Sequence, residues 1–567
     1  MADSDILLDP RGIQERPTLR LAPRLSLEEL REGPVLFYDN TKLAFCNYAK
    51  IFTRLRENLA ELGITNIVDV VETVRGKSSA QLKAYGADLV ARTRVKAAVV
   101  ALGDMGTSPA TTVVTIGIEE AGVPAVYITA PPGSDLVKAV AHYRAGNLCL
   151  CPVDIFQGST PEEVGAEVDR QMGRIVDSLT LPPRELPAVS TIDFELDREA
   201  PTGVIELPAP AAGHGRAAEA GERLEEVNDL FVSLHLSDGL PIVPPTPRRY
   251  EEMLAYCPWA PELALAHEIG PSGKDITVRD VAVAAVMAGC KPTAMPVLVA
   301  AFRAMASDRY NFLQSVTTSH PGGNLVLVSG PLAKQVGLYG GQGCMGPGSR
   351  SNLTVGRAVN LVLINTSRSV PGVCDLACLS SQAEITYCFA EERDLTPWPT
   401  INEEHFDERT TTVYVLKAEP PHDVIDFLST DAGDLLDTIV DSCTTLGSNN
   451  AYMPGPLVLV LVPDHMELLR RGGWDKASIR DHIHQRAHNE TALVRNRGLS
   501  PARSLEFENR HPMPVTRTPK DVEVVVAGGR GGHSMVILPW ALHSEGIVEP
   551  VLLPDGSVPE GIESFRR

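Results

Sequence analysis

The feature that most constrains the fold is an alternation of short β-rich runs with amphipathic stretches between residues 33 and 181. The expected strands are PVLFYDN, TNIVDVVE, KAAVVALGD, PAVYITA and NLCLCPVD. The expected helices lie at 44–62, 79–92, 107–121, 135–143 and 161–179. Repeated β-α units of this length predict a doubly wound parallel sheet covered by helices on both faces. The predicted fold class is therefore α/β, and a larger mixed α/β region follows this sheet.

A chain of 567 residues is too long for one ordinary core, so two to four domains are expected. An amino-terminal extension covers 1–32 and the first α/β domain covers 33–181. Residues 182–223 are rich in Pro, Ala and Gly without apolar periodicity, which is typical of a linker. The carboxyl-terminal region covers 224–567, and a break between two subdomains is expected near 420–455.

Composition limits the partners of this chain. The formal net charge of -21 argues against a nucleic acid or an anionic membrane, because phosphate groups attract Lys and Arg. No apolar run reaches the ~20 residues that span a bilayer, and the first residues lack the pattern of a secretion signal. Ten cysteines are too few for a disulfide scaffold in a chain of this size. We expect a cytoplasmic protein that binds a small anionic substrate, and a homo-oligomer because that state is common among such enzymes.

Two strand ends in the first domain carry polar residues. One is Asp39-Asn40-Thr41-Lys42, and the other is Gly103-Asp104-Met105-Gly106-Thr107-Ser108. In parallel α/β sheets, ligands bind in the crevice beyond the carboxyl ends of the strands. The sequence therefore predicts a binding crevice at these two ends.

The same residues carry a family resemblance. The pattern DNTK, then GDMGTS before a helix, then EEAGVPAVYITA resembles the UGSC family, whose members contain selenocysteine or cysteine and are distantly similar to the selenoprotein subunit of glycine reductase. The resemblance covers roughly the first 180 residues, and it implies a (seleno)cysteine, Gly, Ser and Cys on the strand-to-helix turn. A thiolate there would gain from the helix N-terminus, which lowers its pKa.

This chain departs from the family pattern at the residues that would react. Met105 stands where the resemblance places the first redox residue, and Ser108 stands where it places the second cysteine. Neither side chain forms a thiolate, so the usual redox reaction of the family is not expected here. Asp104, Thr107 and Ser108 are expected to bind a substrate anion, or alternatively to form a turn that only packs.

A Gly-rich stretch, VGLYGGQGCMGPGSRSNLTVGRAVNLVLIN, occupies the carboxyl-terminal region. Its glycines permit positive φ, and a helix that starts near its serines would add free N–H groups. The alternative is a turn that only packs tightly. We expect an anion-binding loop formed by Gly341, Gly343, Gly346, Gly348, Ser349 and Asn352.

A second Gly-rich stretch, AGGRGGHS, directly follows the strand DVEVVV. The Pro in VILPW makes a poor start for a long helix, so a dinucleotide is not expected. Gly529 and Gly531 are expected to bind the same anion if the two loops face each other across a cleft.

Candidate catalytic groups gather around the first loop. They are three cysteines at Gly-rich or strand-end positions, a carboxylate after one of them, and a histidine at a turn: Cys290, Cys344, Cys388, Glu391 and His320. A nucleophilic thiol needs a lowered pKa and a base, whereas a lone cysteine is more often buried and inert. No motif requires a cofactor. The CxxxC spacing of Cys374 and Cys378 matches no common zinc or iron–sulfur pattern, so no metal ligand is assigned, although the sequence leaves a metal open.

The carboxyl-terminal motifs DGLPIVPPTP, MAGCKP and GRAVNLVLIN resemble a segment often joined to UGSC-like domains in bacterial sequences, which names no activity. The leading hypothesis is a small-molecule enzyme of the lyase or oxidoreductase class. It would cleave or form a carbon–heteroatom bond, by a reductive or eliminative reaction that uses cysteine or acid–base residues. One alternative is a metal-dependent hydrolase or hydratase, and another is a non-catalytic ligand-binding or assembly protein.

Overall fold

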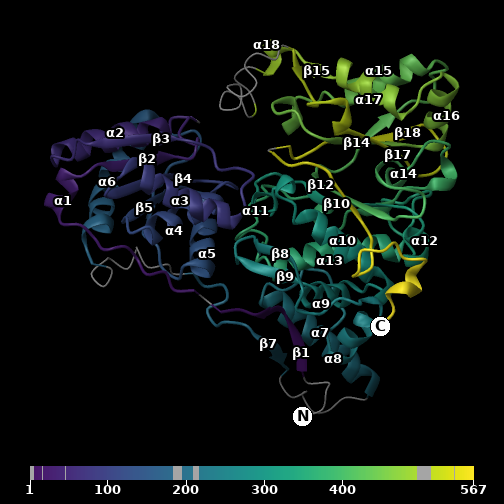
Figure 1. The fold of residues 1–567 in the computed structure, drawn as a ribbon, viewed down its shortest axis with the longest axis horizontal. Helices are drawn as coiled ribbons and strands as arrows, with labels where there is room; N and C mark the ends of the chain where they lie inside the picture. Colours follow the sequence, from purple (N-terminus) through teal and green to yellow (C-terminus); the bar gives the residue numbers. More distant parts are fainter. Residues whose placement is uncertain are drawn as a thin grey trace.

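The computed structural model describes residues 6–15, 17–44, 46–182, 194–207, 216–494, 498, 512–541 and 543–567. Figure 1 shows an amino-terminal α/β unit beside a taller carboxyl-terminal region, with the short helix α11 (Phe312–Ser315) between them. None of the described helices combines the length and the apolar character that a membrane crossing requires.

The amino-terminal unit is built on a parallel five-stranded sheet with the order β3-β2-β4-β5-β6. Its strands are β2 (Val35–Asp39), β3 (Ile67–Val71), β4 (Ala97–Gly103), β5 (Ala125–Thr129) and β6 (Leu150–Pro152). One face packs against α1 (Leu27–Glu32), α2 (Ala49–Glu61) and α6 (Pro161–Thr180), and the other against α3 (Ser79–Thr93), α4 (Ser108–Glu120) and α5 (Gly133–Arg144). The predicted doubly wound α/β fold is confirmed.

Local sequence explains where these elements begin. Every residue of β2, β4 and β5 is buried, as expected for strands that carry helices on both faces. Reciprocal capping boxes start α3 at Ser78 and α6 at Thr160, each with a partner three residues later.

The strand order gives the sheet a switch point between β2 and β4. The helix after β2 covers one face of the sheet and the helix after β4 covers the other, so the chain diverges between these neighbouring strands. Such a switch point opens a crevice beyond the carboxyl ends of the two strands. This switch point lies at the ends of β2 and β4, beside Asp39 and Asp104, and a binding crevice there stays a prediction.

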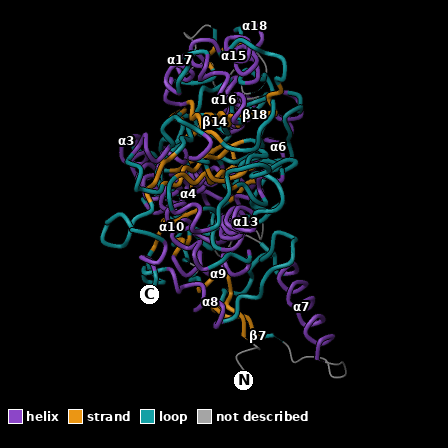
Figure 2. Tube along the Cα trace, turned by 90° about the vertical axis from the view of Figure 1, so that its right-hand side faces the viewer, coloured by secondary structure: helices purple, strands orange, loops and turns teal. Residues whose placement is uncertain are grey.

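The amino terminus is attached to the other region. Strand β1 (Ile6–Ile13) pairs antiparallel with β7 (Thr202–Glu206), and the N–H of Leu8 donates to the carbonyl of Pro245 at 2.9 Å. The segment predicted as a linker, 182–223, thus contains β7 and the start of α7 (Arg216–Ser233). Figure 2 shows α7 projecting from the body of the molecule.

The carboxyl-terminal region is a four-layer sandwich. Its first sheet has the order β11-β10-β12-β19, and its second has the order β13-β18-β14-β17. The two sheets pack face to face, because the inward residues of both form one apolar cluster. The first sheet comprises β10 (Gly323–Ser329), β11 (Cys388–Ala390), β12 (Thr412–Ala418) and β19 (Ile547–Pro550), and the second comprises β13 (His422–Ile425), β14 (Leu457–Leu461), β17 (Val522–Val526) and β18 (His533–Ile537).

Helices cover both outer faces of this sandwich. The first sheet packs against α9 (Val278–Ala288), α10 (Met295–Met305) and α13 (Arg350–Asn365). The second packs against α15 (Ala432–Ser442), α16 (Pro463–Arg471) and α17 (Lys476–Arg486). The expected break near 420–455 coincides with the passage from the first sheet to the second, but β19 returns to the first.

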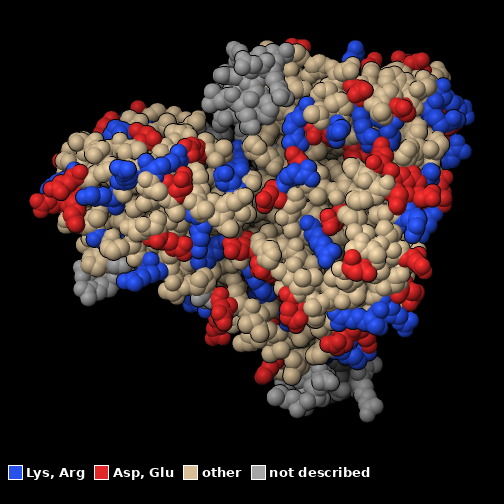
Figure 3. Space-filling view, in the orientation of Figure 1, with Lys and Arg blue, Asp and Glu red and all other residues tan. Residues whose placement is uncertain are grey.

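Shorter elements complete the region. They are α8 (Pro247–Met253), β8 (Ala264–Ile269), β9 (Lys274–Thr277), α12 (Leu332–Val336), α14 (Ile401–His405), β15 (His488–Asn489), α18 (Thr491–Val494) and β16 (Met513–Pro514). Single-turn 3₁₀ helices lie at Leu254–Tyr256, Pro292–Ala294, Asp308–Tyr310, Gln382–Glu384, Arg393–Leu395, Asn449–Ala451, Pro519–Asp521 and Ile562–Phe565. On the face drawn in Figure 3, acidic and basic side chains are interspersed.

Candidate functional site

The first half of the site is the turn after β4. Asp104 is 1 % exposed, and its carboxylate lies 3.4 Å from the Nζ atom of Lys42, which follows β2. Neither carboxylate oxygen of Asp104 has a hydrogen-bond partner among the described residues, and the same holds for the Oγ1 atom of Thr107. A Cβ on Gly133 would lie 2.4 Å from the Asp104 carbonyl carbon, so glycine is required for this close packing.

Neighbouring residues hold this turn in place. The Asn40 amide exchanges two hydrogen bonds with the backbone of Leu102, each 3.1 Å long. The Ser108 hydroxyl donates to the Met105 carbonyl and accepts from the Met105 N–H. Burial raises the pKa of Asp39, whose carboxylate accepts from the Leu43 N–H. Ser108, a predicted substrate-binding residue, is thus engaged in shaping the turn.

A loop of the carboxyl-terminal region lies on this turn. The Thr317 hydroxyl is 3.4 Å from the Gly106 carbonyl oxygen, and a Cβ on Gly106 would lie 2.9 Å from the Thr318 Cα. The Thr318 Oγ1 atom accepts from the Trp540 indole N–H at 3.1 Å and from the His320 N–H at 3.2 Å. The structure therefore brings Asp104 and Thr107 to the same interface as His320.

His320 forms a dyad with a carboxylate. Its Nε2 atom is 3.3 Å from Oε1 of Glu419, which also accepts from the Ser448 hydroxyl at 2.7 Å. The His320 Nδ1 atom is buried and has no hydrogen-bond partner within the described segments. When Nε2 carries the proton that faces Glu419, Nδ1 presents a lone pair and acts as a base.

A buried lysine lies two residues before Glu419. Lys417 is 4 % exposed, and its Nζ atom makes no hydrogen bond or ion pair in the described part of the chain. Burial lowers its pKa, while the nearby carboxylates of Glu384 and Asp375 act in the opposite direction. Burial, with the negative charge of Glu384, raises the pKa of Asp375 to about 6.

Two more buried polar groups lack partners among the described residues. They are the Oε1 atom of Glu384 and the whole side-chain amide of Asn450, which is 0 % exposed. The adjacent Asn449 amide donates to the Trp540 carbonyl at 2.9 Å, so this turn lies beside Trp540. We call the whole group the interface site: Lys42, Asp104, Thr107, His320, Asp375, Glu384, Lys417, Glu419 and Asn450.

Most buried polar groups in proteins are hydrogen-bonded, and each unsatisfied group costs about 1–3 kcal/mol. Several such groups on segments that meet around Thr318 and Trp540 are typical of a place that binds a ligand or ordered water. Sequence reasoning missed Lys417, Asp375, Glu419 and Asn450. The signal available in the sequence was Lys417, near the end of the apolar run TTVYVLKA. A strand that is buried along its whole length buries this lysine too.

The three predicted nucleophilic cysteines lie elsewhere. Burial raises the pKa of Cys344 to about 11 and of Cys290 to about 12, and it raises the pKa of Cys388 as well. The Cys290 thiol lies 3.2 Å from the carbonyl of Thr354, to which it donates. Their role as nucleophiles stays a prediction, and burial weighs against it because the thiolate is the reactive form. The exposed cysteines are Cys46 and Cys378.

The two Gly-rich loops touch each other instead of facing across a cleft. Gly341 pairs with Gly528, whose N–H donates to the Gly340 carbonyl at 2.7 Å. A Cβ on Gly529 would lie 2.8 Å from the Gln342 Cγ, so the loops leave no room there. The N–H of Gly531 donates to the Asp464 carboxylate at 2.9 Å, so a side chain of the protein itself occupies part of the second loop.

The start of α13 follows the sequence prediction. The Ser349 hydroxyl accepts from the Asn352 N–H as the N-cap, and the Asn352 amide donates to the carbonyls of Tyr339 and Cys344, each at 2.8 Å. Gly343 and Gly348 adopt positive φ, and the Gly346 N–H closes a turn onto the Gly343 carbonyl. Anion binding by these residues stays a prediction.

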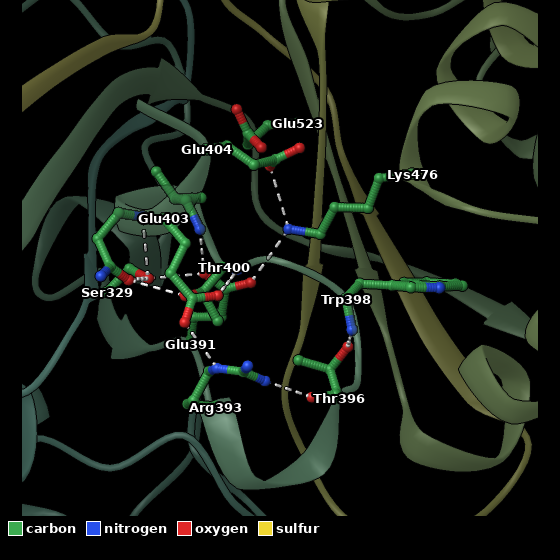
Figure 4. A network of polar contacts seen from close by, with 12 residues as sticks. Ser329, Glu391, Arg393, Thr396, Trp398, Thr400, Glu403, Glu404, Lys476 and Glu523 are labelled. Carbon is green, nitrogen blue, oxygen red and sulfur yellow. Dashed lines mark hydrogen bonds and ion pairs between the residues drawn. The ribbon is translucent and has the colours of Figure 1, made fainter. Parts of the chain in front are cut away.

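Glu391 belongs to a separate network between the two sheets of the sandwich. Its Oε2 atom accepts from the Ser329 hydroxyl and from the Ile401 N–H, both at 2.8 Å. Figure 4 shows Lys476 reaching between Glu391 and Glu404, at 3.4 and 3.2 Å. A cavity of about 180 Å³ lies beside this network. We call this set of residues the Glu391 network: Ser329, Glu391, Thr400, Asn402, Glu404, Lys476, Arg480 and Glu523.

The described residues present no group of three or more His, Cys, Asp or Glu side chains that could hold a metal ion. The metal that the sequence left open therefore has no candidate ligand cluster in this part of the chain.

Comparison with known proteins identifies the first unit. Residues 6–180 match the model of the UGSC family. No curated protein and no solved structure matches the chain. The match spans β1 through α6 and so includes the turn after β4 that carries Asp104. The amino-terminal α/β unit of this chain is a UGSC-family domain.

Proposed function

We propose that the protein is an enzyme that cleaves or forms a carbon–heteroatom bond of a small metabolite by acid–base catalysis in the interface site. The observation that carries this proposal is the His320–Glu419 dyad, whose free Nδ1 lies at an interface with several buried polar groups that lack partners among the described residues. Polar groups that converge at a domain interface are common in binding and active sites.

The dyad supplies the base of an elimination. Glu419 holds the Nε2 proton of His320, so Nδ1 takes a proton from the carbon next to the bond that breaks. Asp375, whose pKa is about 6, still holds a proton in part of the molecules near neutral pH and can give it to the departing heteroatom.

An elimination needs no oxidant or reductant, because the electron pair of the C–H bond forms the new double bond while the heteroatom leaves with its own pair. This agrees with the expectation that Met105 and Ser108 replace the redox residues of the UGSC pattern. The lyase class is therefore favoured over the oxidoreductase class. Lys42 is the group proposed to attract an anionic part of the substrate.

The test is a panel of β-hydroxy, β-amino and β-thio carboxylates, aldehydes and ketones, assayed for the ultraviolet absorbance of the unsaturated product. Exchange of the α-proton with D₂O, followed by NMR, reports proton removal even where elimination is slow. Replacing His320 by Gln is expected to reduce both signals by about 10²–10⁴-fold. The matched control is His405→Gln, because the His405 side chain is 44 % exposed and lies outside the site.

Equal rates for wild type and His320→Gln would contradict the assigned base. The absence of exchange and of product throughout the panel would contradict the elimination.

A further inference from the structure

We infer that Lys417 binds a carbonyl substrate covalently, as an imine, so the substrate class is an aldehyde or ketone with a leaving group on the second carbon from the carbonyl. This inference rests on the proposed function, since it names the substrate of the same site. It adds a covalent step in which the lysine activates the bond that His320 attacks.

The position of Lys417 is fixed by its strand. It lies near the end of β12, opposite Asn324 of β10, and its carbonyl accepts from the Trp540 N–H at 2.9 Å. Its side chain is more than nine-tenths buried, yet its Nζ atom has no hydrogen-bond or ion-pair partner within the described residues. The strand thus holds this amine in place, and no described residue occupies it with a hydrogen bond or an ion pair. A nucleophilic amine needs both conditions.

The contrast with a second buried lysine sharpens this point. Lys476 is 3 % exposed, and its Nζ atom lies between two carboxylates at 3.4 and 3.2 Å. An amine held between two carboxylates is engaged in ion pairs and is not free to attack a carbonyl. Lys417 lies near Asp375 and Glu384 but forms no ion pair within 4 Å with either of them.

The protonation states of the neighbours support the chemistry. Burial lowers the pKa of Lys417, which increases the fraction of the neutral amine. The carboxylates of Glu384 and Asp375 act electrostatically on the amine, and the His320–Glu419 pair lies at the same end of β12. Asp375, with a pKa of about 6, can exchange a proton with the nitrogen and oxygen of the adduct.

The step balances without a further reactant. The neutral Lys417 nitrogen adds to the carbonyl carbon, and the carbonyl oxygen leaves as water after it takes up two protons, so a C=N bond replaces C=O. Protonation of the imine gives an iminium, which draws electrons from the adjacent C–H bond when His320 removes the proton of that bond. The resulting enamine expels the leaving group, and water then releases the product and regenerates the amine.

The experiment uses the full-length protein with propionaldehyde or pyruvate as the probe and cyanoborohydride as the reductant. The reductant converts an imine into a stable secondary amine, which peptide mass spectrometry locates. Lys417 is expected to be modified at least about tenfold faster than the exposed Lys520, because a larger share of it is neutral. Lys417→Arg removes the nucleophilic amine and should leave labelling of Lys520 unchanged.

Labelling of Lys417 at or below the rate of Lys520 would overturn the inference. The variant His320→Gln separates it from the proposed function, because this variant should keep the Lys417 adduct and lose α-proton exchange. If exchange and elimination proceed without any Lys417 adduct, the acid–base function stands and the imine is wrong. If the adduct forms but no substrate of the panel exchanges its proton, the imine stands and the elimination is wrong.

Discussion

The interface site and the Glu391 network are both buried and rich in charge, but they differ in how far their polar atoms are satisfied. In the Glu391 network, Lys476 and Arg480 pair with carboxylates, and Ser329 and Asn402 have hydrogen-bond partners. In the interface site, the Lys417 amine, an amide, a ring nitrogen and several carboxylate oxygens have no hydrogen-bond partner among the described residues. A satisfied network joins two layers of a fold, whereas unsatisfied buried groups agree with the proposed binding of a ligand or of ordered water.

The largest expected contrast is between the two buried lysines. Lys476→Met leaves Glu391 without its cation inside the sandwich, and losing one partner of a buried pair costs about 3–5 kcal/mol of unfolding free energy. Lys417→Met removes an amine that forms no ion pair with a described residue, so its unfolding free energy should stay within about 1 kcal/mol of wild type. Chemical denaturation of both variants measures the difference, and equal losses would contradict the comparison.

Asp375 gives a pH-dependent contrast. Its pKa is raised by burial from 3.8 to about 6, so between these values the unfolded state loses the proton before the folded state does. Folding stability therefore falls as pH rises through this window, by at most about 3 kcal/mol. Asp375→Asn should match wild type near pH 4 and be more stable above pH 6. Urea denaturation at several pH values measures this difference.

The matched control for Asp375→Asn is Asp475→Asn at the N-cap of α17. The hydrogen bonds from Ser478 lower the pKa of Asp475, so its contribution to stability is present above the ordinary pKa and is lost on acidification. The Asn variant at 475 should therefore be the less stable one at neutral pH. Thermal unfolding across pH measures the change in stability of both variants. If both variants were stabilised, or both destabilised, at neutral pH, the opposite pKa shifts assigned to Asp375 and Asp475 would be contradicted.

The smallest contrast is between two buried asparagines. Asn402 accepts from Ser329 and Thr400 and donates to the Asp407 carbonyl, so Asn402→Leu should cost about 2–3 kcal/mol. The Asn450 amide has no hydrogen-bond partners in the described chain, so Asn450→Leu should be neutral or should stabilise by up to about 1 kcal/mol. Denaturant midpoints compare the two, and a larger loss for Asn450→Leu would mean that this amide is engaged.

The first domain is predictable because its signals are local. Each strand from β2 to β6 is a short apolar run between turn residues, and parallel strands place the polar residues that follow them at one edge. The sequence alone therefore assigns Asp104 and Thr107 to a crevice. The turn around His320 marks it as a candidate, but its partner Glu419 lies 99 positions away and leaves no local pattern.

The glycine-rich loops show the opposite case. Their composition permits an anion site, but composition does not say what fills the space between two loops. In the structure, their backbones pair at Gly341 and Gly528, and the Asp464 carboxylate accepts a hydrogen bond from the N–H of Gly531 in the second loop. Contacts between segments nearly 200 residues apart decide such outcomes, and a single sequence does not encode them in any short motif.

The ribbon of β1 and β7 has a mechanical consequence. The chain enters and leaves the UGSC domain through these two paired strands, and β1 is anchored on the carboxyl-terminal region through Leu8 and Pro245. The UGSC domain is also held at other points, because the Arg144 guanidinium donates to the carbonyls of Glu268 and Gly270, and Leu313 packs in the apolar cluster of α3 and α4. The ribbon is therefore one of several attachments, and loosening it alone would leave the two halves in contact.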